Sequence, residues 1–284
     1  MKRVLLVLSA ACSVFLFSCQ KEVDFENGSG NTGGGSSSGT LLVRKVEKTG
    51  VDSLVTTYKY NASKRVINLK ITGTDQGTPV STEYRYYRNS SGIITYYSII
   101  DADLLALGID SIRIDVHSSA SKYTSYVTRL IVPGFILLDS SVFVYDGQGK
   151  IIREDLYESP SGTGNDYSSL SKANYSYTAN GNISQFDYHE FDNTGAEVFW
   201  AMTKVGYDSK TNPMLFDNEA FPVGHYEWVC PNNFVNQQLS SSNGPSEDQT
   251  VTTTYTYNSN NRPVTGIIKV MPDNTTINLA FYYQ

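Results

Sequence analysis

Side chains suited to acid–base chemistry or metal binding lie closest together in one short stretch, which holds Asp187, His189, Glu190 and Asp192. Carboxylates beside a histidine are typical of metal sites and of proton-transfer pairs. On a strand, alternate side chains point to opposite faces, so Asp187 and His189 share one face and Glu190 lies on the other. The stretch therefore predicts neither a catalytic pair nor a metal site.

Other catalytic patterns are incomplete. The remaining histidines, His117 and His225, have no second ligand at a metal-binding spacing. Two Ser-x-x-Lys matches lack the SDN and KTG motifs that accompany a catalytic Ser-x-x-Lys. We expect no catalytic residue, no metal ion and no cofactor. A hydrolase whose carboxylates meet from distant strands, such as Asp187 and Glu219, is the alternative.

The N-terminus has the pattern of a secretory signal. Lys2 and Arg3 precede an apolar run over residues 4–17, and Ser18 and Cys19 follow. A basic start, an apolar segment and a small residue at the cleavage point form a signal peptide rather than a membrane span. The Leu-Phe-Ser-Cys sequence resembles the bacterial lipobox, which implies cleavage after residue 18 and acylation of Cys19. Several acyl chains on one residue suffice for stable membrane anchoring.

A flexible tether follows the cysteine. Residues 27–40 read NGSGNTGGGSSSGT, a composition typical of flexible coil. The sequence QKEVDFE after Cys19 resembles the lysine-plus-acid export signal of surface lipoproteins of Bacteroidetes, with Lys21 and Glu22 as the adjacent match. We therefore divide the chain into a signal peptide (1–18), a lipidated tether (19–40) and one domain (41–284). The resemblance implies an outer-membrane lipoprotein that is exposed at the cell surface.

Composition limits what the domain binds. Loss of Lys2 and Arg3 with the signal peptide changes the net charge from −6 to −8. No stripe of Lys and Arg is apparent, which argues against nucleic acid or anionic lipid as a partner. We therefore expect contact with the membrane through the lipid anchor only. Cys230 is the single cysteine of the domain, and we expect it to be a small buried side chain.

One short pattern recurs along the domain. In VYDGQGKII, Tyr145 is followed by a polar turn and by the start of a new apolar run. The same frame, an aromatic residue followed four positions later by Gly, Asn, Lys, Ser or Thr, fits without gaps at other places. The anchors of the frame are Tyr60, Tyr87, Tyr145, Tyr177, Tyr207, Tyr257 and, in a weaker copy, Trp228.

Each copy predicts a β-hairpin turn. An aromatic-x-Tyr pair places two rings on one face of a strand. Asp or Asn after the Tyr can bond forward to the backbone and start a turn. Gly or Asn four residues after the Tyr tolerates the positive φ that closes a short loop. We therefore expect a series of hairpins in which each anchor is a packing residue.

The spacing of the anchors predicts the architecture. Most anchors are about 30 residues apart, which is the length of two strands and two turns. The wider gap between Tyr87 and Tyr145 indicates a further hairpin near residues 113–127. We predict an all-β domain, a long antiparallel meander of about 14–18 strands that closes into a flattened barrel or barrel-like roll. One short helix is expected at residues 101–108, with Asp101 as its cap.

Two family resemblances bear on this fold. The Tyr-Asp-x-x-Gly-x-Ile unit around Tyr145 is similar to the YD repeats of Rhs and teneurin shells. A closer resemblance is to a family of uncharacterised Bacteroidetes lipoproteins with a porin-like fold. It is carried by the lipobox, the Tyr-x-Tyr hairpins and the segments Tyr207–Met214 and Pro231–Val235. The family implies an antiparallel β-barrel over residues 41–284 and supplies no catalytic residue.

A porin-like shape does not require that the strands face lipid. A lipid-facing strand presents an apolar outer face over about ten residues. The segments YNASKRVINLKIT and YSYTANGNISQFDYHEF carry charged or amide side chains on both faces. We therefore expect a soluble barrel that Cys19 holds at the membrane.

Ligand contacts are expected at the longer connections. Short turns inside the repeats should lie at one rim and the connections between repeats at the other, the longer ones being residues 72–81, 157–171, 216–224 and 240–249. Trp200, Tyr167 and Phe221 lie in or near these connections and could stack on a sugar or a peptide. The alternative is that they cover the barrel end. DSL and DSI resemble a Bacteroidetes O-glycosylation sequon, which implies glycans on Ser53 and Ser111.

The sequence therefore leaves three functions open. The first is a non-catalytic surface- or outer-membrane-anchored lipoprotein that binds a polysaccharide or an outer-membrane protein through its longer loops. The second is the hydrolase described above. The third is a purely structural envelope protein.

Overall fold

The computed structural model describes residues 41–284 except 121, 133–134, 160, 165 and 215–229. The described chain is almost entirely β-structure. Its strands are β1 (Leu42–Thr49), β2 (Asp52–Tyr60), β3 (Val66–Asp75), β4 (Thr78–Arg88), β5 (Ile94–Asp101), β6 (Ile112–Ser119), β7 (Lys122–Val132), β8 (Phe135–Tyr145), β9 (Ile151–Ser159), β10 (Ser168–Tyr177), β11 (Ile183–Phe191), β12 (Glu197–Thr211), β13 (Asn232–Ser241), β14 (Gln249–Tyr257), β15 (Pro263–Met271) and β16 (Thr275–Tyr283). Their number lies within the predicted range.

Helical structure in the described chain is confined to two short segments. The helix α2 (Ala102–Ala106) lies where it was expected, and the Asp101 side chain caps it by accepting a hydrogen bond from the backbone N–H of Asp103 at 2.9 Å. The 3-10 turn η3 (Pro245–Glu247) lies between β13 and β14. Within the described ranges, no helix is long and apolar enough to cross a membrane.

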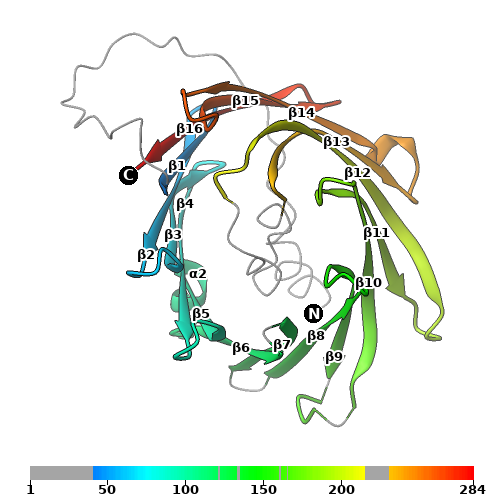
Figure 1. Ribbon diagram of the computed structural model, residues 1–284. Helices are drawn as coiled ribbons and strands as arrows, with labels where there is room; N and C mark the ends of the chain where they lie inside the picture. The colour runs from blue at the N-terminus through cyan, green and yellow to red at the C-terminus, as the bar shows by residue number, and fades with distance from the viewer. Residues whose placement is uncertain (1–40, 121, 133–134, 160, 165, 215–229) are drawn as a thin grey trace.

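The strands form one closed antiparallel barrel. Each strand pairs with its neighbours in the sequence, and β1 pairs with β16 so that Val46 lies opposite Ala280. The view along the barrel axis shows an oval ring (Figure 1). The gap between Tyr87 and Tyr145 contains the hairpin of β6 and β7. The predicted all-β meander and its closure are confirmed, and closure leaves no unpaired sheet edge.

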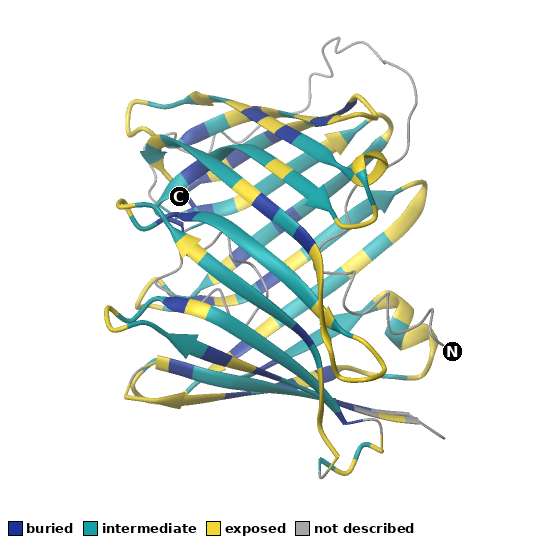
Figure 2. Ribbon diagram, turned by 90° about the vertical axis from the view of Figure 1, so that its right-hand side faces the viewer, coloured by how far each residue is buried: buried dark blue, intermediate teal, exposed yellow. Residues whose placement is uncertain are grey.

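The up-and-down course of the chain creates two rims. We call one the tyrosine rim, and its short turns are residues 61–65, 89–93, 146–150, 178–182 and 258–262. We call the other the loop rim, and its described connections are residues 50–51, 76–77, 102–111, 161–167, 192–196, 242–248 and 272–274. The chain enters β1 and leaves β16 at the tyrosine rim, where Leu41 and Gln284 exchange two backbone hydrogen bonds of 3.1 and 3.0 Å. Figure 2 shows the C-terminus at this end, on the left.

Two of the long connections that we expected at one rim differ from that expectation. Residues 72–81 are not a loop, because β3 and β4 are joined by the two-residue turn of Gln76 and Gly77, both at positive φ (50° and 74°). Such a turn is a tight hairpin connection, and the nearby Pro79 lies within β4. Residues 216–224 are among those not described, but β12 ends and β13 begins at the tyrosine rim.

Strand register and burial identify the inner and outer faces of the wall. In β16, Leu279, Phe281 and Tyr283 are buried, whereas Asn278 and Tyr282 are exposed. In a barrel of one sheet, the buried face is the inner one. The same alternation continues around the ring, and the inner face carries most of the core cluster, which includes Tyr58, Leu69, Tyr86, Ile94, Ile114, Phe143 and Ile183. Burial of these large apolar side chains is the main source of stability.

Candidate functional surfaces of the barrel

At the tyrosine rim, anchor tyrosines close the open ends of the hairpins. The hydroxyl of Tyr60, the last residue of β2, donates to the carbonyl of Leu42, the first residue of β1, at 2.6 Å. The same bond, here called a latch, joins Tyr145 to Tyr123 (2.5 Å), Tyr177 to Ile151 (2.7 Å) and Tyr283 to Pro263 (2.6 Å). Burial raises the pKa of Tyr145 to about 12, so the hydroxyl stays a donor at neutral pH. Each latch combines a packed ring with a satisfied polar end.

The turns of this rim share one geometry. In the turn after β8, the Asp146 carboxylate accepts hydrogen bonds from the backbone N–H groups of Gln148 and Lys150, both at 2.9 Å. Asparagines accept equivalent bonds in three other turns, at Asn61, Asn89 and Asn258. The residue two positions before the return strand is left-handed, with φ 85° at Gly149. Polar turn starters and a positive φ are the features that the sequence pattern contains.

The anchor predicted at Tyr87 is displaced by one residue. Tyr87 is the next-to-last residue of β4, and its exposed ring stacks on Tyr96 with ring centroids 4.2 Å apart. Arg88 occupies the latch position, and its guanidinium donates to the carbonyl of Val66 at 2.7 Å. The left-handed residue is Gly92, with φ 80°, five positions after Tyr87 rather than four. The frame matched the aromatic residue one position before the latch position, which an arginine occupies in this hairpin.

The last three predicted anchors differ from one another. Tyr207 does not end its strand, because β12 continues past it, and its hydroxyl lies 3.2 Å from the sulfur of Cys230. Tyr257 ends β14, but its hydroxyl bonds to the Asp208 carboxylate instead of a latch carbonyl. Trp228 falls in the undescribed segment 215–229. Irregular pairing at the end of β12 accounts for the departure of Tyr207 from the frame.

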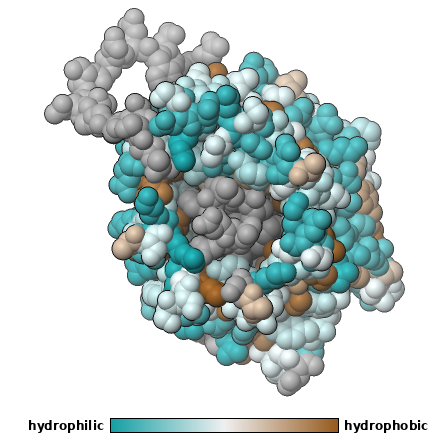
Figure 3. All heavy atoms as spheres, in the orientation of Figure 1, coloured by the Kyte–Doolittle hydropathy of each residue, from teal (hydrophilic) through white to brown (hydrophobic). Residues whose placement is uncertain are grey.

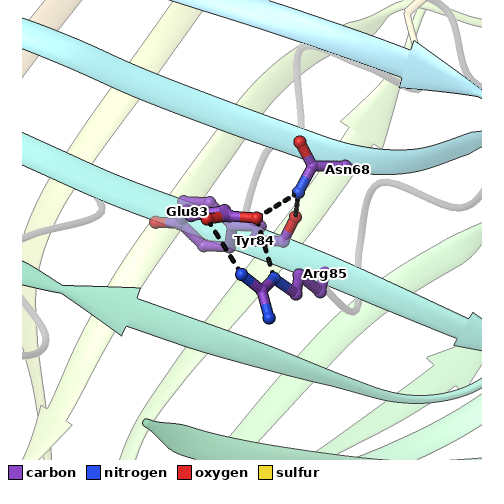
Figure 4. Close-up of polar contacts among 4 residues, drawn as sticks. All are labelled: Asn68, Glu83, Tyr84 and Arg85. Carbon is purple, nitrogen blue, oxygen red and sulfur yellow. Dashed lines mark hydrogen bonds and ion pairs between the residues drawn. The ribbon is translucent and has the colours of Figure 1, made fainter. Parts of the chain in front are cut away.

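A cluster of polar side chains joins β3 and β4 on the outer wall at mid-height (Figure 4). Glu83, in the middle of β4, accepts hydrogen bonds from Arg85 Nε at 2.7 Å and Asn68 Nδ2 at 2.8 Å. Asn68 also donates to the carbonyl of Tyr84 at 3.3 Å. The hydrogen bond from Arg85 is the largest influence on Glu83 and lowers the pKa of its carboxyl group. An ion pair at this height would be costly against hydrocarbon.

Much of the outer wall has the same character, whereas the outward positions of β8 are mostly apolar and include Ile136, Val142 and Val144. Arginines lie over outward tyrosines, with Arg44 Cζ 3.8 Å from the ring centre of Tyr282 and Arg113 Cζ 3.9 Å from that of Tyr96. The outward positions of β14 are all threonines, namely Thr250, Thr252, Thr254 and Thr256. Figure 3 looks along the barrel axis onto the tyrosine rim, where the residues are mostly hydrophilic and neutral with scattered hydrophobic ones. Among the described strands, none has the unbroken apolar outer face of a lipid-facing strand.

Carboxyl groups gather on the inner wall of β8 and β9. Asp139 and Glu158 lie directly opposite each other, and one carboxylate oxygen of Asp139 is buried with no hydrogen-bond partner among the described residues. Burial, and then the negative charge of Glu158, raise the pKa of Asp139 to about 6. Farther along β9, Glu154 accepts the hydroxyls of Tyr126 at 3.1 Å and Tyr175 at 3.2 Å, while burial raises its pKa. Sequence reasoning missed this group because its members meet only through strand register.

Exposed apolar side chains are concentrated at the loop rim. Val51, in the turn between β1 and β2, is 84% exposed, and Leu107, just after α2, is 75% exposed. The other exposed large apolar residues at this rim are Leu105, Ile136, Tyr167, Val198, Phe199, Trp200 and Met271. Exposed apolar groups gathered at one end of a molecule are typical of an interaction surface.

Two of the three predicted ligand contacts lie at this rim. Trp200 is 40% exposed and packs edge-on against Tyr188, with ring centroids 5.5 Å apart. Tyr167 is 39% exposed and lies just before β10. The strands β10 and β11 separate the two, so they do not form one aromatic platform. Phe221 belongs to the part of the chain that is not described.

Among the described residues, Asp187, His189, Glu190 and Asp192 do not form an acid–base site, and only His189 contacts a carboxylate of opposite charge type. Asp187 and His189 share the outer face of β11, as the alternation predicted. His189 Nδ1 lies 2.9 Å from Glu197 Oε1, and Lys172 pairs with the same carboxylate. Glu219, the suggested partner of Asp187, is not described. In the described ranges, no group of three or more His, Cys, Asp or Glu side chains could hold a metal ion.

The modification sites stay predictions. Ser111 is exposed just before β6, and Ser53 is half-buried on the outer side of β2. Cys230 is 1% exposed, which agrees with a small buried side chain. Cys19 precedes the first described residue.

Solved structures with a similar barrel exist. A porin-like protein from Bacteroides vulgatus superimposes with a TM-score of 0.54 at 12% identity, covering 86% of this chain and 99% of the other. The barrel has a porin-like fold. A second porin-like protein, from Bacteroides uniformis, has a TM-score of 0.52 at 12% identity, covering 87% of this chain and 98% of the other. No family model and no curated protein matches the chain.

The porin-like likeness concerns architecture alone, because the identity is 12%. It confirms the antiparallel barrel that the family resemblance implied. Barrels of about sixteen strands include membrane porins, which present an apolar band to lipid. The outer wall of this chain has ion pairs, amides and threonines instead, so its porin-like shape is combined with a different wall chemistry.

Proposed function

We propose that this chain is a non-catalytic, lipid-anchored envelope protein whose barrel stands in water and whose loop rim binds a partner protein. The lipobox-like sequence at Cys19 supports the anchor, since it follows a basic and apolar signal segment. The polar outer wall supports a barrel that does not span the bilayer. The observation that carries the proposal is the set of exposed apolar side chains at the loop rim.

The loop rim suits a protein better than a sugar. The most exposed tips, Val51 and Leu107, are aliphatic and offer no ring on which a sugar could stack. The described connections of this rim contain no Lys or Arg, and their acidic residues are Asp103, Asp110, Asp166, Asp192, Glu247, Asp248 and Asp273. An apolar surface flanked by basic residues on the partner would be complementary in shape and charge.

Site-specific photo-crosslinking in the producing bacterium tests this proposal. A photoreactive residue in place of Val51 or Leu107 should give a discrete adduct with one protein. The same residue in place of Ser63 or Gln148, exposed turn positions of the tyrosine rim, is the matched control and should give none. Leu105→Ser combined with Leu107→Ser should weaken the adduct from position 51. Equal adducts from both rims, or none from any position, would overturn the proposal.

The anchor is tested separately. Mass spectrometry of the N-terminal peptide should find acyl chains on Cys19, and Cys19→Ser should release the chain from the membrane fraction. An unmodified Cys19 in a membrane-bound protein would exclude the lipid anchor and would not affect the proposal that the loop rim binds a partner.

A glycan is the second candidate partner, favoured by the half-exposed ring of Trp200 beside Tyr188. Saturable binding of residues 20–284 to one polysaccharide class on a glycan array, weakened at least tenfold by Trp200→Ala, would support it. Phe199→Ala is the matched control, because Phe199 packs against His189 instead. Unchanged binding in Trp200→Ala would exclude this site for the sugar.

A further inference from the structure

Charge is divided unequally between the two rims. At the tyrosine rim, basic residues from separate turns and strand ends form what we call the basic ring, made of Lys64, Arg65, Arg88, Lys122, Lys150, Lys210 and Arg262. The described acidic residues nearest to them are Asp146 and Asp208. The sequence between β12 and β13 also contains Asp217, Glu219 and Glu227, so that five acidic residues in all stand against the seven basic ones. The overall charge of −6 therefore conceals a basic end and an acidic end.

The latch tyrosines and the turns hold the basic ring in place. Lys122 Nζ lies 5.0 Å from the ring centre of Tyr145, and Lys150 Nζ lies 5.0 Å from that of Tyr177. Lys210 Nζ donates to the Asn261 side chain at 2.8 Å. Rings and amide oxygens orient an ammonium group without neutralising its charge. These cations thus keep a net positive charge to present at the end of the barrel.

The chain enters the barrel at the same rim. β1 begins and β16 ends beside the basic ring, and the Gly/Ser-rich segment 27–40 leads into Leu41. An anchor at Cys19 would therefore keep the tyrosine rim, rather than the loop rim, close to the membrane.

We propose that the tyrosine rim is the membrane-facing end of the barrel and that its basic ring binds the phosphate groups of anionic lipids. The orientation rests on the proposed lipid anchor, but the binding of anionic lipid does not require it. The acidic loop rim does not cancel this attraction, because strands of about ten residues separate the rims by far more than the Debye length of about 8 Å. The loop rim is then turned away from the membrane and towards a partner.

Flotation of the mature chain without its acylated cysteine, residues 20–284, on lipid vesicles tests the proposal. This chain keeps every strand of the closed barrel. It should bind vesicles of phosphatidylcholine with about one-third phosphatidylglycerol and not vesicles of phosphatidylcholine alone, and added salt should release it. Equal binding to both vesicles, or binding to neither, would overturn the proposal.

Two variants with the same net charge locate the binding surface. The variant Lys64→Glu/Lys122→Glu/Lys150→Glu should weaken binding at least tenfold. The matched control, Lys48→Glu/Lys70→Glu/Lys269→Glu, changes exposed residues of the outer wall and should weaken it less than twofold. An equal loss in both variants would mean that only total charge matters and would exclude the basic ring.

Separate control experiments address folding of the variants and acylation of Cys19. If charge reversal lowers the melting temperature, Lys64→Gln/Lys122→Gln/Lys150→Gln provides the comparison, and unchanged binding in a folded Gln variant would contradict the proposal. Acylation of Cys19 is read from the mass of the N-terminal peptide of the cell-derived protein. The peptide mass tests the lipid anchor and vesicle flotation tests lipid binding, so either proposal can fail without the other.

Discussion

At the scale of single residues, the latch tyrosines join a packed ring to a hydroxyl that reaches a carbonyl of the neighbouring strand. The hydroxyl of Tyr177 lies 2.7 Å from the carbonyl of Ile151, where β9 begins. A phenylalanine would fill the same space but would leave that carbonyl without its hydroxyl donor. The choice of Tyr over Phe at the rim follows from this backbone group.

The latch predicts different losses in the free energy of unfolding for three kinds of substitution. Tyr145→Phe or Tyr177→Phe should lower the free energy of unfolding by about 1 kcal/mol, the usual net contribution of a hydrogen bond. Tyr145→Ala or Tyr177→Ala should lower it by about 3–5 kcal/mol, because the packed ring is lost too. Tyr87→Ala, at an exposed ring, is the control and should cost less than about 1 kcal/mol. Urea denaturation measures all three, and a loss under about 1 kcal/mol for both Ala variants at the latch would contradict the packing role.

Asp139 predicts a pH-dependent stability. Because burial raises its pKa to about 6 in the folded chain, the folded state binds more protons than the unfolded state between about pH 4 and pH 6. The contribution of Asp139 to stability is therefore present at low pH and is lost as the pH rises through this window. Asp139→Asn should raise the melting temperature at about pH 7 and change it less at about pH 4.

The neighbouring carboxyl group supplies the control for this experiment. Glu158→Gln removes a negative charge that raises the pKa of Asp139, so it should shift the pH dependence to lower pH without abolishing it. An Asp139→Asn variant with the same pH profile as the unaltered protein would show that another group is responsible.

At the scale of elements, one turn geometry is used repeatedly at the tyrosine rim. A register shift of one residue precedes these turns, between Val144 and Tyr145 in β8 and between Ser176 and Tyr177 in β10. The extra residue is accommodated by a left-handed position, as at Gly149 and Gly181. Among the described turns of the loop rim, the same geometry appears once, after Phe191, at a place that was not among the predicted anchors.

Two glycines of the turn after β8 test whether the left-handed conformation, rather than the presence of a glycine, stabilises the turn. Gly149→Ala should destabilise the fold by about 1–2 kcal/mol, because its φ of 85° is unfavourable for a side chain. A Cβ there would also lie 3.0 Å from Lys122 Nζ. Gly147→Ala, two residues earlier, meets no atom within 4 Å and should change stability by less than about 0.5 kcal/mol. Equal effects on the urea midpoint would contradict the assigned turn.

At the scale of the whole molecule, the two wall faces differ in their main side chains. Large apolar and aromatic side chains face inward, while ion pairs such as Glu83 with Arg85 face outward. A membrane porin has the reverse arrangement, with an apolar outer band. The described wall is thus suited to water on its outer side.

This polarity predicts a protein that needs no detergent. Residues 20–284 should remain in solution without detergent and should not release dye from lipid vesicles, even where they bind anionic lipid. Glu83→Leu combined with Arg85→Leu should lower solubility while circular dichroism keeps the β-sheet spectrum, because it exposes an apolar patch on the wall. Dye release by the unaltered chain would show that the barrel inserts into lipid.

Local features of the sequence determined the elements. Alternation of side chains, polar turn starters and residues that tolerate positive φ act over a few neighbouring positions, so the strands, the turns after Tyr60, Tyr145, Tyr177 and Tyr257, and the helix cap at Asp101 were predictable. Closure also followed, because a meander of this length otherwise exposes its edges.

Only the tertiary structure decided what meets across the barrel. The pairing of Asp139 with Glu158, the replacement of Tyr87 by Arg88 in the latch and the division of charge between the rims depend on strand register and on closure. Register joins residues that are far apart in the chain, and a shift of one residue reverses which face a side chain occupies. No local pattern contains that information, which is why the basic ring is invisible in a sequence that is acidic overall.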